Sequence, residues 1–131
     1  MKQPIWIDPE IVIAIHKRQI AEHGGYGGVK DQARLASALM RPQQKYAYRA
    51  TNVDADIFML AAAYGFSITQ NHPFHDGNKR IGYITMRLFL KLNGYDINAS
   101  QAEKYRIMMR LAAGKISETM LADWLRKHKN R

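Results

Sequence analysis

The chain has 131 residues, which is the size of one ordinary domain, and we expect residues 1–131 to form a single domain. Hydrophobic residues make up 47% and charged residues 24%, a balance that excludes gross disorder. The absence of cysteine excludes disulfides, zinc–thiolate sites and cysteine nucleophiles. No apolar run approaches the ~20 residues that span a bilayer, and the N-terminus does not resemble a signal peptide. We therefore expect a soluble protein of the cytoplasm.

Positive charge is concentrated in the second half of the chain. The formal net charge is +9, from 20 lysines and arginines against 11 acidic residues. Residues 1–76 hold 8 basic and 7 acidic side chains, whereas residues 77–131 hold 12 and 4. Such a field favours polyanionic partners, namely a nucleotide, a nucleic acid or an acidic protein, without choosing among them.

Helix signals dominate the N-terminal third. Asp8-Pro9-Glu10 combines an N-cap residue, a proline suited to the first helical position and an acidic first turn. This pattern predicts a helix to about His23, which Gly24-Gly25 ends. Asp31 is the expected N-cap of a second helix, and Pro42 is expected to end it.

The most apolar helix is predicted over about 55–70, with Asp54 as its cap. Apolar residues lie nearly all round this segment, so we expect it to be the central, buried helix. Residues 42–52 are ambiguous, since they suit either a short helix or a surface flap.

Three more helices are predicted in the second half. One runs from about Asn78 to Asn93, with Gly94 just after its end. Ser100-Gln101-Ala102-Glu103 has the pattern of a capping box, and a last helix starts near Ser117. The tail, residues 126–131, is expected to fray. The sum is an all-α bundle of five to seven helices.

One segment, His72-Pro73-Phe74-His75-Asp76-Gly77-Asn78-Lys79-Arg80, gathers reactive side chains where the buried helix ends and the next begins. The first amides of a helix lack intrahelical acceptors and carry partial positive charge. Gly77 lets the backbone approach an anion, and Lys79 and Arg80 add full positive charges. Each of these residues alone would be ordinary in a solvated loop. Together they predict a phosphate-binding site at a helix N-terminus.

The other side chains of the segment suggest group transfer. Asp76 can hold Mg²⁺, which bridges to phosphate oxygens. His72 can accept a proton near neutral pH. Asn78 can either orient a phosphate or shape the loop, and Phe74 is expected to anchor the loop in the core.

The segment resembles the Fic motif, HxFx(D/E)GN(G/K)R, and its Lys79-Arg80 ending is similar to the Doc branch, the death-on-curing toxins. The N-terminal stretch around His23-Gly24-Gly25 and Asp31 also resembles Doc-type sequences. The resemblance implies a Fic-fold kinase that uses ATP and Mg²⁺ to phosphorylate translation elongation factor Tu. By position it implies His72 as the base, Asp76 as the metal ligand, and Gly77, Asn78, Lys79 and Arg80 as phosphate contacts.

Two departures separate this chain from the AMP-transferring members of the family. Those proteins usually have glycine where this chain has Lys79, and a second arginine where it has Tyr83. Their self-inhibitory (S/T)xxxE(G/N) motif is also missing, so inhibition is expected from a separate antitoxin protein. No membrane contact and no direct nucleic-acid binding are expected.

Several features have two interpretations. Tyr46, Tyr48 and Arg49 suit a flap that holds the target peptide, although plain surface packing is the more ordinary interpretation. The basic helix with Lys104, Arg106 and Arg110 suits an acidic antitoxin segment or a solvated face. Trp124 is expected in the core, and His75 receives no role.

Three other functions remain as alternatives. The first is an AMP transferase of the same fold. The second is a metal phosphohydrolase that uses His72, His75 and Asp76. The third is a non-catalytic basic module that binds nucleic acid, although no helix-turn-helix or aromatic stacking pattern stands out.

Overall fold

The computed structural model describes residues 3–48 and 56–130, and these form the all-α bundle that the sequence predicts. In chain order the elements are α1 (Pro9–His23), α2 (Gln32–Ala47), α3 (Ile57–Asn71), α4 (Asn78–Leu92), β1 (Asp96–Ile97), α5 (Gln101–Ala112), α6 (Glu118–Lys127) and β2 (Lys129–Asn130). The two short strands pair antiparallel. Among these described residues, no helix is long and apolar enough to cross a membrane.

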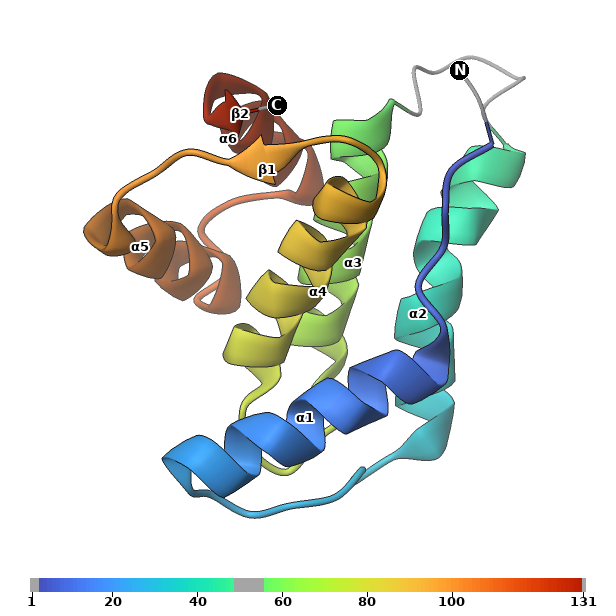
Figure 1. The fold of residues 1–131 in the computed structure, drawn as a ribbon, viewed down its shortest axis with the longest axis vertical. Helices are drawn as coiled ribbons and strands as arrows, with labels where there is room; N and C mark the ends of the chain where they lie inside the picture. The colour runs from blue at the N-terminus through green and yellow to red at the C-terminus, as the bar shows by residue number, and fades with distance from the viewer. Residues whose placement is uncertain (1–2, 49–55, 131) are drawn as a thin grey trace.

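Helix α3 is the centre of the fold, as its composition predicts. Eleven of its 15 residues are buried, because α2, α4 and α6 all pack against it (Figure 1). The backbones of α3 and α4 approach closely at Gly65 and Gly82. A Cβ added to Gly82 would lie 2.5 Å from Thr69 Oγ1 and 3.1 Å from the Gly65 carbonyl oxygen. This tight antiparallel pair fixes the loop that joins the two helices.

Side-chain caps begin most of the helices where the sequence predicts them. Asp8 caps α1, Asp31 caps α2, Ser117 caps α6, and Ser100 forms a complete capping box with Glu103 at α5. The cap of α3 is different. Asp56 accepts a hydrogen bond from Met59 N at 2.8 Å, so the helix starts two residues later than expected. Asp54, the predicted cap, lies outside the described residues.

The prediction that Pro42 ends the second helix is wrong. Helix α2 continues to Ala47, and Pro42 is buried inside it. Proline has no N–H, so it leaves the carbonyl of Ala38 without its usual helical donor. The Ser67 hydroxyl of α3 lies 2.9 Å from that carbonyl oxygen and 2.5 Å from the Ala63 carbonyl oxygen of its own helix. Its single proton is shared between the two acceptors and in part replaces the missing bond. Of the ambiguous segment 42–52, residues 42–47 are therefore helical, Tyr48 is the C-cap of α2, and residues 49–52 lie outside the described residues.

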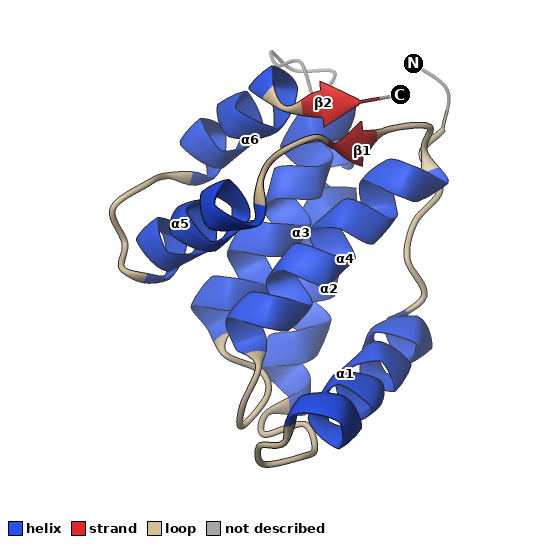
Figure 2. Cartoon of the chain, turned by 60° about the vertical axis from the view of Figure 1, so that its left-hand side comes forward, coloured by secondary structure: helices blue, strands red, loops and turns tan. Residues whose placement is uncertain are grey.

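The expected fraying of the tail is also wrong for residues 126–130. Lys129 and Asn130 pair with Ile97 and Asp96, which places the end of the chain on the segment between α4 and α5 (Figure 2). The His128 ring contacts two other residues, with Nδ1 2.8 Å from the Trp124 carbonyl oxygen and Nε2 3.1 Å from a carboxylate oxygen of Glu103. Trp124 packs against the core, as predicted.

Candidate functional site

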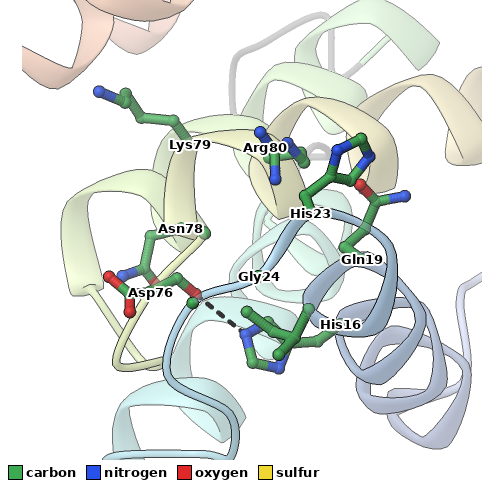
Figure 3. A pocket seen from close by; sticks show the side chains of 11 residues that line it. His16, Gln19, His23, Gly24, Asp76, Asn78, Lys79 and Arg80 are labelled. Atoms are coloured by element: carbon green, nitrogen blue, oxygen red, sulfur yellow. Dashed lines mark hydrogen bonds between the residues drawn. The ribbon is translucent and has the colours of Figure 1, made fainter.

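A cavity of about 390 Å³ lies between the C-terminal half of α1 and the junction of α3 with α4 (Figure 3). Its walls come from two parts of the chain that are about 55 residues apart. One wall is the end of the reactive segment, and the other is α1 with the glycines that follow it. The lining residues are His16, Gln19, Ile20, His23, Gly24, Gly25, Asp76, Gly77, Asn78, Lys79 and Arg80.

Five of the six predicted site residues line this cavity, and His72 does not. His72 is the C-cap of α3 and is exposed. Its backbone is in the left-handed region, with φ 49° and ψ 54°, which is uncommon for a residue other than glycine. The helix therefore ends at His72, and this histidine lies at the surface where the loop to α4 begins.

The N-terminus of α4 differs from the other helix starts in the described residues. Gly77, at the N-cap position, offers no side-chain acceptor, whereas each of the other five helices has a side chain that accepts a backbone N–H. The first amides of α4 therefore have neither an intrahelical acceptor nor a side-chain cap. They lie at the cavity together with the positive end of the helix dipole, which favours an anion there.

The Asp76 carboxylate is held from the side of the glycine-rich loop. Its Oδ2 accepts a hydrogen bond from the backbone N–H of Tyr26 at 2.6 Å. Gly25, at φ 112°, makes this close approach feasible, because a Cβ there would lie 3.2 Å from Ile20 Cδ1 and 3.4 Å from Asp76 Cβ. The glycines after α1 thus end the helix, as predicted, and also bring the chain against Asp76.

Phe74 and Asn78 hold the loop in shape. Phe74 is fully buried, as predicted for an anchor. The Asn78 side chain bonds it in both directions: Nδ2 donates to the Phe74 carbonyl and Oδ1 accepts from the Phe74 N–H, each at 3.0 Å. Of the two roles that the sequence leaves open for the Asn78 side chain, this geometry favours shaping the loop. Its backbone N–H, in the first turn of α4, is the group left to face an anion.

The two cations of the segment point in different directions. Lys79 extends away from the cavity (Figure 3), and its Nζ lies 3.4 Å from the sulfur of Met109 on α5. Arg80 lies on the same side of the cavity mouth as His23 of α1. Both cations are exposed, so each can reorient toward a bound anion.

The α1 wall of the cavity was not predicted from the sequence. His16, Gln19, Ile20 and His23 line the cavity, and their spacing of three, one and three residues places them on one helical face. That spacing was visible in the sequence, but nothing local indicated which segment the face would meet. This face of α1 meets a segment 60 residues further along the chain: the Asp76 carbonyl oxygen lies 2.9 Å from His16 Nε2.

The residues at the cavity fit Mg²⁺ better than a transition metal. Among the described residues there is no group of three or more histidine, cysteine or acidic side chains that could share a metal ion, which gives the phosphohydrolase alternative no support there. Mg²⁺ is usually held by one or two carboxylates together with waters and substrate phosphates. Asp76 can supply that carboxylate, because the Tyr26 amide occupies Oδ2 and not Oδ1.

Comparison with known proteins agrees with this description. Residues 6–90, which contain both walls of the cavity, match the model of the Fic/DOC family. The chain is 34% identical over 121 residues to the "Protein kinase doc" of Escherichia phage P1, an alignment that covers 92% of this chain and 93% of the phage protein.

Proposed function

The chain belongs to the Fic/DOC family, and we propose that it is a Doc-like toxin that transfers the γ-phosphate of ATP to a serine or threonine hydroxyl of a translation factor. The resemblance of the segment 72–80 to the Doc branch points to elongation factor Tu as that factor. Phosphorylation of the factor would arrest translation in the cytoplasm.

The observation that carries the proposal is the uncapped start of α4 beside Asp76. Free backbone amides, the helix dipole and Arg80 together form an anion-binding surface in a cavity large enough for part of a nucleotide. A triphosphate suits this surface, because the first amides of α4 can hold one phosphate and Arg80 can grip two oxygens of another.

In this proposal each side chain has one task during transfer. His72 accepts the proton of the target hydroxyl, whose oxygen bonds to the γ-phosphorus while the bond to the β-phosphate oxygen breaks and ADP leaves. Asp76 would hold Mg²⁺, which neutralises phosphate charge when it is bound. The amides of Gly77 and Asn78, with Lys79 and Arg80, stabilise the charge that moves onto the leaving phosphate.

The exposed position of His72 suits this task. A base that must meet a hydroxyl on another protein has to be reachable from outside, and His72 stands at the surface at the end of α3. His72 does not line the cavity, which the loop reaches only from Asp76 onward, so nucleotide and protein substrate can bind at different parts of the loop. We expect His72 to come within hydrogen-bond distance of the target hydroxyl, next to the γ-phosphate, when both substrates are bound.

Tyr83 favours phosphate transfer over AMP transfer. AMP-transferring members have an arginine at this position. Burial raises the pKa of Tyr83 to about 12, so the phenol is neutral at physiological pH and supplies no charge for a second phosphate. Lys79, in place of glycine, puts a long cation at the start of α4. Both features support a nucleotide that presents its γ-phosphate, rather than its α-phosphate, to His72.

The proposal includes a separate antitoxin that restrains the toxin. The exposed cations Arg106 and Arg110 on α5 give an acidic antitoxin segment a surface to bind. Neither direct nucleic-acid binding nor membrane contact is part of the proposed activity.

The proposal is tested by incubating the purified protein with γ-labelled ATP, Mg²⁺ and elongation factor Tu. Wild type should label the factor on serine or threonine, and His72→Ala should not, while its circular dichroism and melting temperature stay unchanged. His75→Ala is the matched control, since His75 lies in the same loop and has no proposed role. Full labelling by His72→Ala would refute the assignment of the base.

A further inference from the structure

Helix α1 buries only two of its residues, and one of them is a histidine. Val12 is fully buried and His16 is 2% exposed. The His16 ring stacks on Phe74, with ring centroids 4.0 Å apart and an angle of 12° between the planes. Its Nε2 lies 2.9 Å from the carbonyl oxygen of Asp76. Because a carbonyl only accepts, Nε2 carries the proton and donates it.

This hydrogen bond fixes the orientation of the peptide unit between Asp76 and Gly77. In a planar trans peptide the N–H points opposite to the C=O, so a carbonyl that faces His16 turns the Gly77 N–H away from the His16 ring. Gly77 has φ 83°, and a flipped peptide would give it a negative φ, which glycine adopts as readily. Glycine itself therefore does not select between the two orientations, and the bond from His16 does.

The two orientations differ in what they offer an anion. In the observed one, the carbonyl is occupied by His16 and the Gly77 N–H is free, since Gly77 precedes the hydrogen-bond ladder of α4. In the flipped one, the Asp76 carbonyl dipole would point to where that N–H points now and would repel a phosphate.

We propose that His16 is a positioning residue, which holds the Asp76–Gly77 peptide so that the Gly77 N–H faces a bound nucleotide phosphate. The inference rests on the proposed function for the identity of the ligand, a nucleoside triphosphate with Mg²⁺. His16 acts through Asp76 and Gly77 and takes no part in proton transfer to the substrate.

Two substitutions separate positioning from mere packing. His16→Phe keeps an aromatic ring against Phe74 and removes the donor. His16→Gln loses the ring and places a side-chain N–H at similar reach. A packing role predicts that Phe is tolerated better than Gln. A positioning role predicts the reverse order for ligand binding.

The experiment is a calorimetric titration of each variant with Mg²⁺ and a non-hydrolysable ATP analogue, next to its melting temperature. We expect His16→Phe to weaken binding by about 10–100-fold, which is typical when a residue that orients a ligating group is lost. His16→Gln should recover most of that loss. The inference would be overturned if His16→Phe bound the analogue as tightly as wild type. It would also be overturned if His16→Gln bound the analogue no more tightly than a folded His16→Phe.

A measurement on wild type covers the case in which a variant does not fold. With ¹⁵N-glycine labelling, the Gly77 amide should show the largest shift of the nine glycine amides when the analogue is added. A Gly77 amide that does not shift, or wild type that does not bind the analogue, would overturn the inference. Binding with the Gly77 shift but without phosphate transfer to protein would instead overturn the kinase proposal alone.

Discussion

The hydroxyl of Ser67, shared with the Ala63 carbonyl of its own helix, in part replaces the helix bond that Pro42 cannot make, and Ser67→Ala tests this compensation. Ser67 is 3% exposed, and its Oγ lies 2.9 Å from the Ala38 carbonyl oxygen. Removing the hydroxyl leaves that carbonyl buried between α2 and α3 without a donor. A buried polar group that loses its partner costs about 1–3 kcal/mol. For a chain of this size each kcal/mol lowers the melting temperature by about 3–5 °C.

The second substitution, Pro42→Ala, restores an N–H four residues after Ala38. In the double variant that N–H can donate to the Ala38 carbonyl, so Ser67→Ala should cost less than it does in wild type. We expect a coupling of about 1 kcal/mol or more between the two sites, within the range seen for residues that share a partner. Urea unfolding followed by circular dichroism measures all four free energies of unfolding.

Ser37→Ala is the matched control. Ser37 lies exposed on α2, the helix that contains Pro42, and its substitution should change the free energy of unfolding by less than about 0.5 kcal/mol. Effects of Ser67→Ala and Pro42→Ala that add to within about 0.5 kcal/mol would refute the compensation. The continuation of α2 through its proline would then need another explanation.

Three further predictions concern the acid stability, the α3–α4 contact and the metal. The hydrogen-bonded guanidinium of Arg87 lowers the pKa of Asp96 from 3.8 to about 2. The pair therefore stabilises the fold above pH 4 and loses this effect as the pH falls toward 2. Because both side chains are partly exposed, we expect a loss of about 1 kcal/mol across that window, which urea unfolding of Asp96→Asn should not show. Parallel pH profiles of the two proteins would contradict this. Gly82→Ala places a Cβ 2.5 Å from Thr69 Oγ1 and should lower the free energy of unfolding by about 1–3 kcal/mol; an unchanged melting temperature would show that the helices do not meet there. Asp76→Asn keeps a side-chain acceptor but loses the charge, so calorimetry should show unchanged folding and a loss of the Mg²⁺ dependence of ATP binding, and a dependence equal to wild type would reject Asp76 as the metal ligand.

Local signals in the sequence were enough to predict most of the fold. The caps at Asp8, Asp31 and Ser100 are confirmed, since an N-cap bonds to amides only two or three residues away. The buried central helix is confirmed for the same reason, because its apolar surface is a property of one segment.

The errors occur where a distant residue decides the local structure. Pro42 lies inside its helix, and the carbonyl that it leaves without a helical donor meets the hydroxyl of a serine 29 residues away. The tail is ordered to Asn130 because it pairs with Ile97 and Asp96, and a two-residue strand leaves no periodic pattern to detect.

The candidate site divides in the same way. The segment 76–80 could be predicted, because all its groups lie in one short stretch at a helix start. His16, Gln19 and His23 could not be assigned, since their face of α1 acquires its meaning only when α1 packs on the α3–α4 loop.

The central claim is that this site delivers the γ-phosphate of ATP to a protein hydroxyl. Parallel reactions with α-labelled and γ-labelled ATP, each with Mg²⁺ and purified elongation factor Tu, test it most directly. We predict label on the factor from the γ position and none from the α position. Label transferred from α-labelled ATP would contradict it and would instead indicate transfer of AMP.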